Sequence, residues 1–311
     1  MTMSSRAKAR EEAPVRRTGL TDRGLAFTMV LPAAVLIAVF AVYPFGIAVW
    51  NSFNDVDIAT GAGVFNGVDN YVAIFSRPEV LAAGLRTVLW TGGNMILQVG
   101  IGIGVALLLN AGLRGQAFLR GLVLFPYMVP AIVVAMVFQF MFNDVTGVVN
   151  YLLQSIGLIQ EPISFLSNPD LLLGTAVVVN VWKYSPFFMI IVLARLQSIP
   201  RELNEAVSMD GGGAIRRFTA VTLPSIMPVV LAGMMLRTIW TAYDFDLPFL
   251  LSNGGGPDQA AVTVPLAIRS LAFESNSIGE ASALAVVTAI VLTGAAYAYM
   301  RGYGRAEKSS R

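Results

Sequence analysis

The amino-acid sequence, 311 residues long, contains no cysteine and no histidine. Without them the chain cannot form disulfide bonds, Cys/His zinc sites, a thiol nucleophile or a Ser-His-Asp triad. Lysine occurs only at positions 8, 183 and 308, and none of these lies in a G-x-x-x-x-G-K-[ST] frame. The chain therefore lacks the glycine-rich loop that holds ATP phosphates in P-loop ATPases.

Charge is also scarce in this sequence. Charged residues make up 13% of the chain and hydrophobic residues 56%, with a mean hydropathy of +0.68. Soluble domains average about a quarter charged residues, so the composition argues against both a soluble enzyme and a disordered protein. The net charge of +2 gives no reason to expect nucleic acid as a partner.

Long apolar runs take the place of charge. Six of them are long enough to cross about 30 Å of lipid hydrocarbon. They cover residues 25–49, 87–109, 121–142, 171–194, 225–251 and 280–300. Prolines and glycines within them are tolerated in membrane helices. The sequence predicts an all-α fold, a polytopic bundle of six transmembrane helices in a lipid bilayer.

Basic residues gather on one side of these spans. Sixteen of the 21 Lys and Arg residues fall at the two ends of the chain and in the segments 111–120 and 195–222. The opposite side has only three, which are Arg77, Arg86 and Arg269. By the positive-inside rule both termini are cytoplasmic. The segments predicted to lie outside are 51–86, 143–170 and 252–279.

The chain is thus predicted to have three parts. Residues 1–24 form a disordered, basic cytoplasmic tail. The first span is too long for a cleavable signal peptide and no A-x-A-like site follows it, so it stays in the protein. Residues 25–300 form the transmembrane domain, with a cytoplasmic loop at 195–224. Residues 301–311 form a cytoplasmic C-terminal tail.

The loop at 195–224 is longer than a connection between two spans needs. Pro200 suits the first position of a helix, and Glu202 suits its positively polarised N-terminal end. Glycines 211–213 are expected to end this helix, and a second short helix is expected at 214–221. By physical chemistry alone, the segment is equally an amphipathic loop on lipid headgroups or a docking element for a cytoplasmic protein.

This loop resembles a known motif. Its residues Glu205-Ala206-Val207-x-x-Asp210-Gly211, followed by Phe218, Leu223-Pro224 and Pro228, are similar to the EAA loop of bacterial ABC-importer permeases. Markers elsewhere resemble the carbohydrate-uptake branch, and within it the MalF-like/UgpA-like permease subunit. These markers are Trp182-Lys183, Leu196-Gln197-Ser198-Ile199-Pro200, Phe245-Asp246 and Gly255-Gly256-Pro257. The resemblance covers about 25–299 and implies a type I ABC importer permease fold in a bacterial cytoplasmic (inner) membrane.

The resemblance also implies partners. In this family the loop forms a coupling helix in a groove of a cytoplasmic ATPase subunit, which favours docking over the lipid-surface alternative. The implied coupling residues are Glu205, Ala206, Asp210, Gly211, Phe218, Leu223 and Pro224. The assembly would contain a second, MalG-like permease, two copies of the ATP-binding subunit and an extracytoplasmic substrate-binding protein. The chain itself would be no enzyme and bind no cofactor, because ATP and Mg²⁺ would belong to the ATPase.

Polar side chains inside the spans are candidates for a substrate pathway, because a charge in hydrocarbon needs a partner, a cavity or a route. At 100° per residue, Arg237, Thr241 and Asp244 share one face of the fifth span, with Trp240 between them. This face suits a polyhydroxylated ligand. The alternative is an intramembrane Arg237–Asp244 ion pair. The polar set of this span also contains Tyr243 and Asp246, and an outer-interface position is favoured for Asp246.

Other spans add weaker candidates. Lys183 lies in the middle of the fourth span and is as well suited to the pathway as to pairing with a partner subunit. Gln139 and Asn143, in the third span, are further candidates for the pathway. Asn94 and Gln98 are four residues apart in the second span and predict interhelical hydrogen bonds.

Glycines 100, 102 and 104 of the second span predict close helix packing. They do not predict a nucleotide site, because no strand–turn–helix context surrounds them.

The leading hypothesis is a permease subunit that forms half of an alternating-access pathway for a sugar, polyol or related glycoside. A neutral carbohydrate is the favoured cargo, whereas a glycerol-phosphate-type cargo would need a cation such as Arg237 or Lys183. An ion-coupled secondary transporter is the second hypothesis, but the acids cluster at one end of one span and no internal repeat is visible. A membrane enzyme is third, and Asp244 and Asp246, two apart, would point in different directions on a helix.

Overall fold

The computed structural model describes residues 22–57, 60–112 and 114–309. Its elements are α1 (Asp22–Ile37), η1 (Ala38–Val42), α2 (Tyr43–Asn51), β1 (Asn54–Val56), β2 (Gly63–Phe65), α3 (Asp69–Ser76), α4 (Pro78–Asn110), α5 (Gln116–Met128), α6 (Ala131–Met141), α7 (Val148–Ser155), α8 (Pro169–Gln197), α9 (Arg201–Met209), α10 (Ala214–Arg217), η2 (Phe218–Thr222), α11 (Leu223–Ala242), α12 (Asp246–Leu251), η3 (Pro257–Gln259), α13 (Val264–Arg269), η4 (Ser270–Glu274) and α14 (Ile278–Ser309). The two short strands pair antiparallel, with Asn54 opposite Phe65. The predicted all-α class is confirmed.

The chain divides into two units, residues 1–47 and 48–311, and the division falls inside α2. In the first unit α1, η1 and the start of α2 follow one another as one apolar helical span, whose side chains from 26 to 47 are exposed. The π-helical turn η1 lies directly before Pro44, which has no N–H to donate to the carbonyl four residues earlier. The predicted tail at 1–24 falls on residues 1–21, outside the described residues, and α1 already begins at Asp22.

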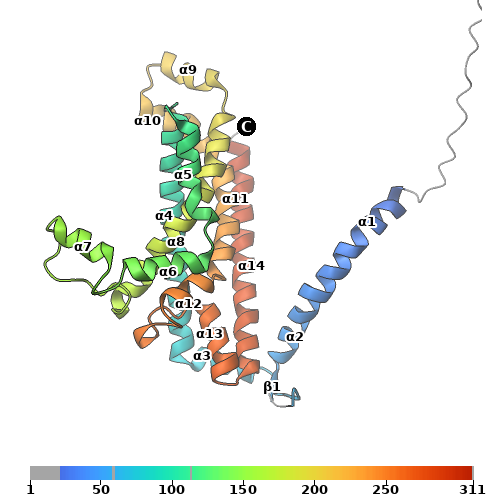
Figure 1. Cartoon of the computed structure of the whole chain (residues 1–311). Helices are drawn as coiled ribbons and strands as arrows, with labels where there is room; N and C mark the ends of the chain where they lie inside the picture. Colours follow the sequence, from blue (N-terminus) through green and yellow to red (C-terminus); the bar gives the residue numbers. More distant parts are fainter. Residues whose placement is uncertain (1–21, 58–59, 113, 310–311) are drawn as a thin grey trace, which may run out of the picture. The chain divides into compact units, whose positions relative to one another are not determined.

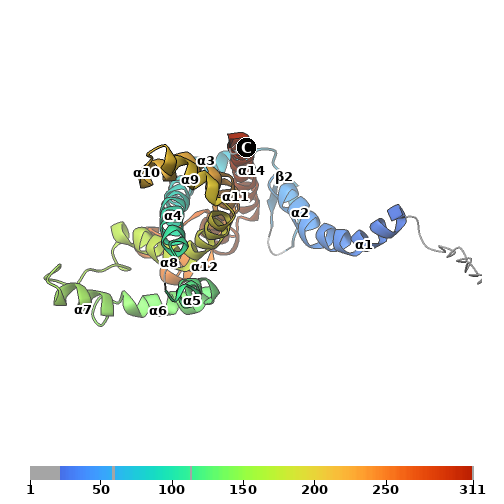
Figure 2. The same ribbon diagram turned by 90° about the horizontal axis from the view of Figure 1, so that it is seen from above.

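In the second unit the long helices α4, α8, α11 and α14 form a bundle (Figure 1). Figure 2 shows from above that α4, α8 and α11 lie together. At one end of this bundle lie α9 and α10, and at the other lie α3, α12 and α13 (Figure 1). Buried apolar side chains fill the bundle from Ile74 near α3, through Trp90 and Val179, to Val192 and Ile226 near α9. The segments 51–86 and 252–279, predicted to lie outside, are therefore at the opposite end of the bundle from the loop at 195–224, predicted to be cytoplasmic.

Helices α4 and α8 pack closely against each other, and Gly102 makes the approach possible. A Cβ atom at Gly102 would lie 2.4 Å from the Cβ of Phe188, which is fully buried on α8. Gly100 and Gly104 have no such neighbour within 4 Å. Of the predicted glycine packing motif, only the middle residue is therefore at the helix contact.

The number of spans agrees with the prediction. Five helical stretches in the described chain are long and apolar enough to cross a membrane, and α5 with α6 make a sixth if the bent pair is one span. The bend between these two helices is 94°. It falls at Val129, whose backbone is extended because the next residue is Pro130.

The fifth span differs from the prediction at both ends. The short helix expected at 214–221 continues through η2 into α11, as one apolar stretch from Ala214 to Ala242. The expected continuation to 251 is wrong, because the helix ends before Tyr243 and a new helix, α12, starts at Asp246. Asp244 lies in the turn between them, with Oδ1 3.5 Å from the Leu247 N–H nitrogen.

Candidate functional site

A chain of hydrogen-bonded amides crosses the centre of the bundle. Gln98 on α4 donates from Nε2 to Asn180 Oδ1 on α8 at 2.9 Å, and to Asn94 Oδ1 at 3.1 Å. Asn180 in turn donates from Nδ2 to Asp244 Oδ2 at 2.8 Å. Asn94, Gln98 and Asn180 are all 0% exposed. The predicted interhelical role is confirmed for Gln98 but not for Asn94, whose hydrogen bonds to Trp90 and Gln98 stay within α4. The network extends from α4 to the turn after α11.

Two cations lie beside this amide chain and converge on one aromatic ring. Arg237 on α11 donates from Nε to Gln98 Oε1 at 3.3 Å, and its Cζ lies 4.1 Å from the centre of the Tyr184 ring. Lys183 Nζ lies 4.9 Å from the same ring and donates to the Val129 carbonyl oxygen. Both cations are 4% exposed. The bend between α5 and α6 thus supplies the acceptor for Lys183.

The ion pair between Arg237 and Asp244, which was the alternative to a pathway role, is not formed. The two ion pairs within 4.0 Å among the described residues are Arg77–Glu280 and Arg269–Glu274. Gln98 and Asn180 lie between the two charged groups. Gln98 accepts from Arg237 and donates to Asn180, and Asn180 donates to Asp244. The shared helical face is also wrong in part, because α11 ends at Ala242 and Asp244 is no longer on it.

The remaining candidates of this span split by exposure. Thr241 is 1% exposed, and its backbone carbonyl accepts from Trp90 Nε1 at 2.9 Å. Trp240 and Tyr243 are 49% and 44% exposed, and Asp246 is also exposed, as expected for an outer-interface position. The members of this set therefore form two groups, one buried in the core and one at an exposed edge that contains two aromatic side chains.

Gln139 and Asn143 lie apart from this network. Gln139 donates from Nε2 to the Leu250 carbonyl at 2.7 Å and to Asn253 Oδ1 at 3.2 Å. Asn143 Oδ1 accepts from the backbone N–H groups of Val145 and Thr146, so it shapes its own turn. Both line an open hollow of about 770 Å³ at the end of the bundle where α12 lies.

The loop at 195–224, predicted to be cytoplasmic, has the predicted helix–turn–helix form. Its first helix, α9, ends in a Schellman motif, because the Gly212 N–H bonds to the Val207 carbonyl at 2.8 Å and the Gly211 N–H to the Ser208 carbonyl at 3.0 Å. Gly211 has the left-handed φ of 75° that this motif requires. A Cβ at Gly212 would lie 2.7 Å from the Val207 oxygen, so both glycines define the turn.

The predicted coupling residues of this loop differ in their exposure. Glu205, Ala206, Asp210 and Gly211 are exposed, whereas Phe218, Leu223 and Pro224 are partly buried where α10 and η2 lead into α11. Two large apolar residues on the same loop were not predicted to be functional, Met209 and Ile215, which are 89% and 82% exposed. The sequence does contain a signal for them, because they are large apolar residues in an otherwise polar segment. An exposed loop with charged and apolar side chains is a surface suited to a protein partner.

Sequence reasoning also missed three residues of the core network. They are Trp90, Asn180 and Tyr184. Asn180 could have been found as a polar residue inside a span, one turn before Lys183. Trp90 gives no such signal, because an indole in an apolar span is equally an ordinary core residue.

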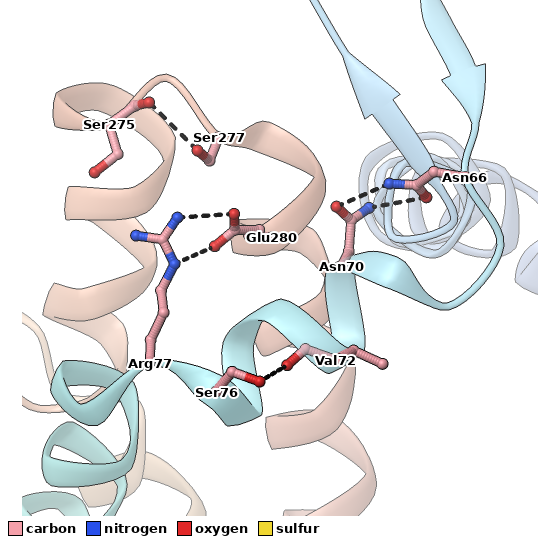
Figure 3. A network of polar contacts seen from close by, with 8 residues as sticks. All are labelled: Asn66, Asn70, Val72, Ser76, Arg77, Ser275, Ser277 and Glu280. Atoms are coloured by element: carbon pink, nitrogen blue, oxygen red, sulfur yellow. Dashed lines mark hydrogen bonds and ion pairs between the residues drawn. The ribbon is translucent and has the colours of Figure 1, made fainter.

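The opposite end of the bundle is held by a separate set of polar contacts. Arg77, before α4, makes a bidentate ion pair with Glu280 on α14, at 2.7 and 2.9 Å (Figure 3). Asn70 on α3 pairs with Asn66 and donates to the backbone oxygens of Ser52 and Asn54. These contacts tie α3, α4, α14 and the β-hairpin together.

A second ion pair lies on the turn η4 at this end. The Ser270 hydroxyl donates to Glu274 Oε2 at 2.8 Å, and Arg269 Nη1 donates to Oε1 at 2.5 Å. These contacts hold the pKa of Glu274 below its ordinary value. The group is exposed, so the pair contributes little to stability.

Comparison with known proteins places the bundle and loop in a class, that of membrane permeases. The model of the family described as binding-protein-dependent transport system inner membrane component matches residues 98–304. The sulfoquinovosyl glycerol transport system permease protein SmoG of Agrobacterium fabrum is 35% identical over 86% of both chains. The trehalose/maltose transport system permease protein MalF of Thermococcus litoralis is 31% identical over 89% of this chain and 92% of its own. UgpA of Yersinia enterocolitica, an sn-glycerol-3-phosphate transport system permease protein, is 31% identical over 89% and 93%.

A solved structure shows the same fold. A chain of a bacterial ABC transporter involved in the import of the acidic polysaccharide alginate matches with a TM-score of 0.77 at 24% identity, over 90% of this chain and 95% of that one. The chain belongs to the family of inner membrane components of binding-protein-dependent transport systems. It is a multi-pass membrane protein and a permease subunit of an ABC importer, as its sequence motifs predicted.

Proposed function

We propose that this permease imports a sugar, polyol or related glycoside by alternating access. The observation that carries this proposal is the network at the centre of the bundle, where polar groups of α4, α8 and α11 meet beside exposed aromatic side chains. Donors, acceptors and aromatic faces together suit a polyhydroxylated ligand. The named cargoes of the relatives, sulfoquinovosyl glycerol, trehalose/maltose and glycerol 3-phosphate, support this class.

The pathway would run along the side of this network. Lys183, Arg237, Thr241 and Asp244 would line it at depth, and Trp240 and Tyr243 at its exposed edge. Asp246, Gln139 and Asn143 would lie at its outer end. One permease supplies half of such a route, so a second, MalG-like permease would close it from the other side.

The loop at 195–224 would couple this route to ATP hydrolysis. Glu205 and Asp210 would meet basic groups of the ATPase, while Phe218, Leu223 and the exposed Met209 would fill apolar pockets. Because η2 joins the loop to α11 without a break in the helical chain, movement of the docked loop would be transmitted to α11. ATP and Mg²⁺ would be bound by the ATPase, and this chain would catalyse no reaction.

We place the ends of the chain and the coupling loop in the cytoplasm, on the basis of the uneven distribution of Lys and Arg. The complete importer would then contain this chain, the second permease, two ATPase subunits and an extracytoplasmic substrate-binding protein. The substrate-binding protein would dock at the end of the bundle that carries α3, α12 and α13.

Purification in mild detergent with a tag on this chain tests the assembly. Identification of the co-purifying chains by mass should recover a second permease and an ATPase, and quantification should give two ATPase subunits per permease pair. Recovery of this chain alone, folded and active in ion-driven uptake, would instead establish a secondary transporter.

A further inference from the structure

Two cations in the transmembrane core have no carboxylate partner within the described chain. Lys183 and Arg237 are each 4% exposed, yet both ion pairs within 4.0 Å among the described residues lie elsewhere. Lys183 donates to a backbone carbonyl, and Arg237 Nε to the neutral amide of Gln98. A buried cation in hydrocarbon is costly without a directly paired counter-charge, and Asp244, the acid that interacts with both cations, does so from beyond ion-pair distance.

Arg237 also has an unused donor. Its Nη2 is buried and has no hydrogen-bond partner in the part of the chain that the structure describes. One helical turn further along α11, Thr241 Oγ1 is buried and unpartnered in the same way. Residues four apart lie on one face of a helix, so the two donors are neighbours. A guanidinium nitrogen and a hydroxyl together suit an oxyanion.

Asp244 does not satisfy these donors. Asn180 Nδ2 occupies its Oδ2 at 2.8 Å, and its Oδ1 faces the Leu247 N–H at 3.5 Å. The Gln98 and Asn180 amides hold it at the far end of the chain of hydrogen bonds from Arg237. Asp246 is exposed at the start of α12 and forms neither of the ion pairs of the described chain.

Partly exposed aromatic side chains flank this buried point on one side. Tyr184, whose ring both cations approach, is partly exposed, and Tyr127 packs edge-on against it with ring centres 5.9 Å apart. Trp240 and Tyr243 are exposed on the neighbouring helix end. A sugar ring could therefore lie on aromatic side chains while a charged substituent reaches inward.

We propose that the cargo is an anionic carbohydrate or polyol, whose carboxylate, sulfonate or phosphate is bound by Arg237 Nη2 and the Thr241 hydroxyl, with Lys183 as the second cation. This inference rests on the proposed pathway and narrows its cargo. It departs from the neutral carbohydrate that the sequence favours, because the sequence could not show that Asp244 leaves Arg237 unpaired.

The test uses the complete importer with its substrate-binding protein, reconstituted in proteoliposomes. The probes are D-glucuronate, D-glucose 6-sulfate and glycerol 3-phosphate, compared with uncharged D-glucose, trehalose and glycerol. We expect at least one anion to stimulate ATPase activity and uptake, and none of the uncharged compounds to do so. Stimulation by an uncharged probe, or by none of the anions, overturns the proposal.

Variants assign the effect to this site. Arg237→Gln should reduce anion-stimulated uptake at least tenfold, while Arg237→Lys keeps part of it. Arg301→Gln, an exposed arginine near the end of α14 stacked on Tyr297, is the matched control and should change nothing. If the Arg237→Gln chain no longer assembles with the second permease, Arg237 pairs with a carboxylate of that subunit and the proposal is wrong.

Two further variants distinguish an error in the charge of the cargo from an error in the pathway residues. If uncharged cargo is transported and Thr241→Val or Asp244→Ala lowers uptake in an assembled complex, the pathway stands and only the anionic cargo is wrong. If neither variant changes uptake, the pathway is wrong whatever the charge of the cargo.

Discussion

The bundle core and the loop at 195–224 place their polar side chains in opposite ways. In the core, Gln98 and Asn180 are 0% exposed and hydrogen-bond to one another and to charged groups on both sides. In the loop, Glu205 and Asp210 are exposed, and their side chains make no hydrogen bond with the described residues. Loss of a core group should therefore reduce stability, whereas loss of a loop group should leave the fold intact and affect only contact with a partner.

The largest effect is expected from charge reversal on the loop at 195–224. Glu205→Lys should abolish substrate-stimulated ATPase activity, because the lysine would face the basic groups that we expect on the ATPase. Thermal unfolding of the purified chain should be unchanged, since Glu205 is exposed. Unchanged transport by this variant would contradict the docking role of the loop.

A core substitution should show the reverse pattern. Gln98→Leu removes the partner of Arg237 Nε and of Asn180 Oδ1, and each unpaired buried group costs about 1–3 kcal/mol. The free energy of unfolding, measured in detergent, should fall accordingly. The matched control is Thr293→Val on an exposed face of α14, which should stay within about 0.5 kcal/mol of the parent. Equal stability of the two variants would mean that the hydrogen-bonded amides do not contribute to the free energy of unfolding.

Glycine substitutions within α4 should differ in their effect on stability, according to how closely each glycine approaches α8. Gly102→Ala places a methyl group 2.4 Å from the Phe188 Cβ and should destabilise the α4–α8 pair by about 1–3 kcal/mol. Gly100→Ala and Gly104→Ala meet open space and should be neutral or stabilising by up to about 1 kcal/mol. Thermal unfolding of the three variants checks this order, and a loss at Gly100 as large as at Gly102 would refute the packing assignment.

The smallest effect is expected from the exposed ion pair at the other end of the bundle. The pKa of Glu274 is lowered, so its contribution is present above the unfolded-state pKa, about 4.3, and is lost as the pH falls through the lower folded-state value. The difference in unfolding temperature between the parent and Glu274→Gln should therefore be small at pH 7 and vanish in acid. A difference that grows on acidification would have the wrong sign for this pair.

The sequence was sufficient for the fold class, the number of spans and the helix–turn–helix form of the loop at 195–224. Apolar run lengths identify the spans, and a turn with Gly211 at positive φ follows from the glycine run. It was not sufficient for the site. Whether Arg237 pairs with Asp244 depends on where α11 ends and on Gln98, which is distant in sequence. Helical periodicity extended past Ala242 places Asp244 on the same helical face as Arg237. It does not reveal the turn after Ala242 that removes Asp244 from this face.

The central claim is that the core network binds the cargo and the loop at 195–224 couples transport to the ATPase. It is tested most directly by measuring assembly, ATPase activity and uptake side by side for Asp244→Ala and Glu205→Lys in the reconstituted importer. We predict that Asp244→Ala assembles with its partners and loses uptake, and that Glu205→Lys loses ATPase stimulation with the membrane fold intact. Loss of assembly by Asp244→Ala with uptake per assembled complex unchanged would contradict the account and make the core network purely structural.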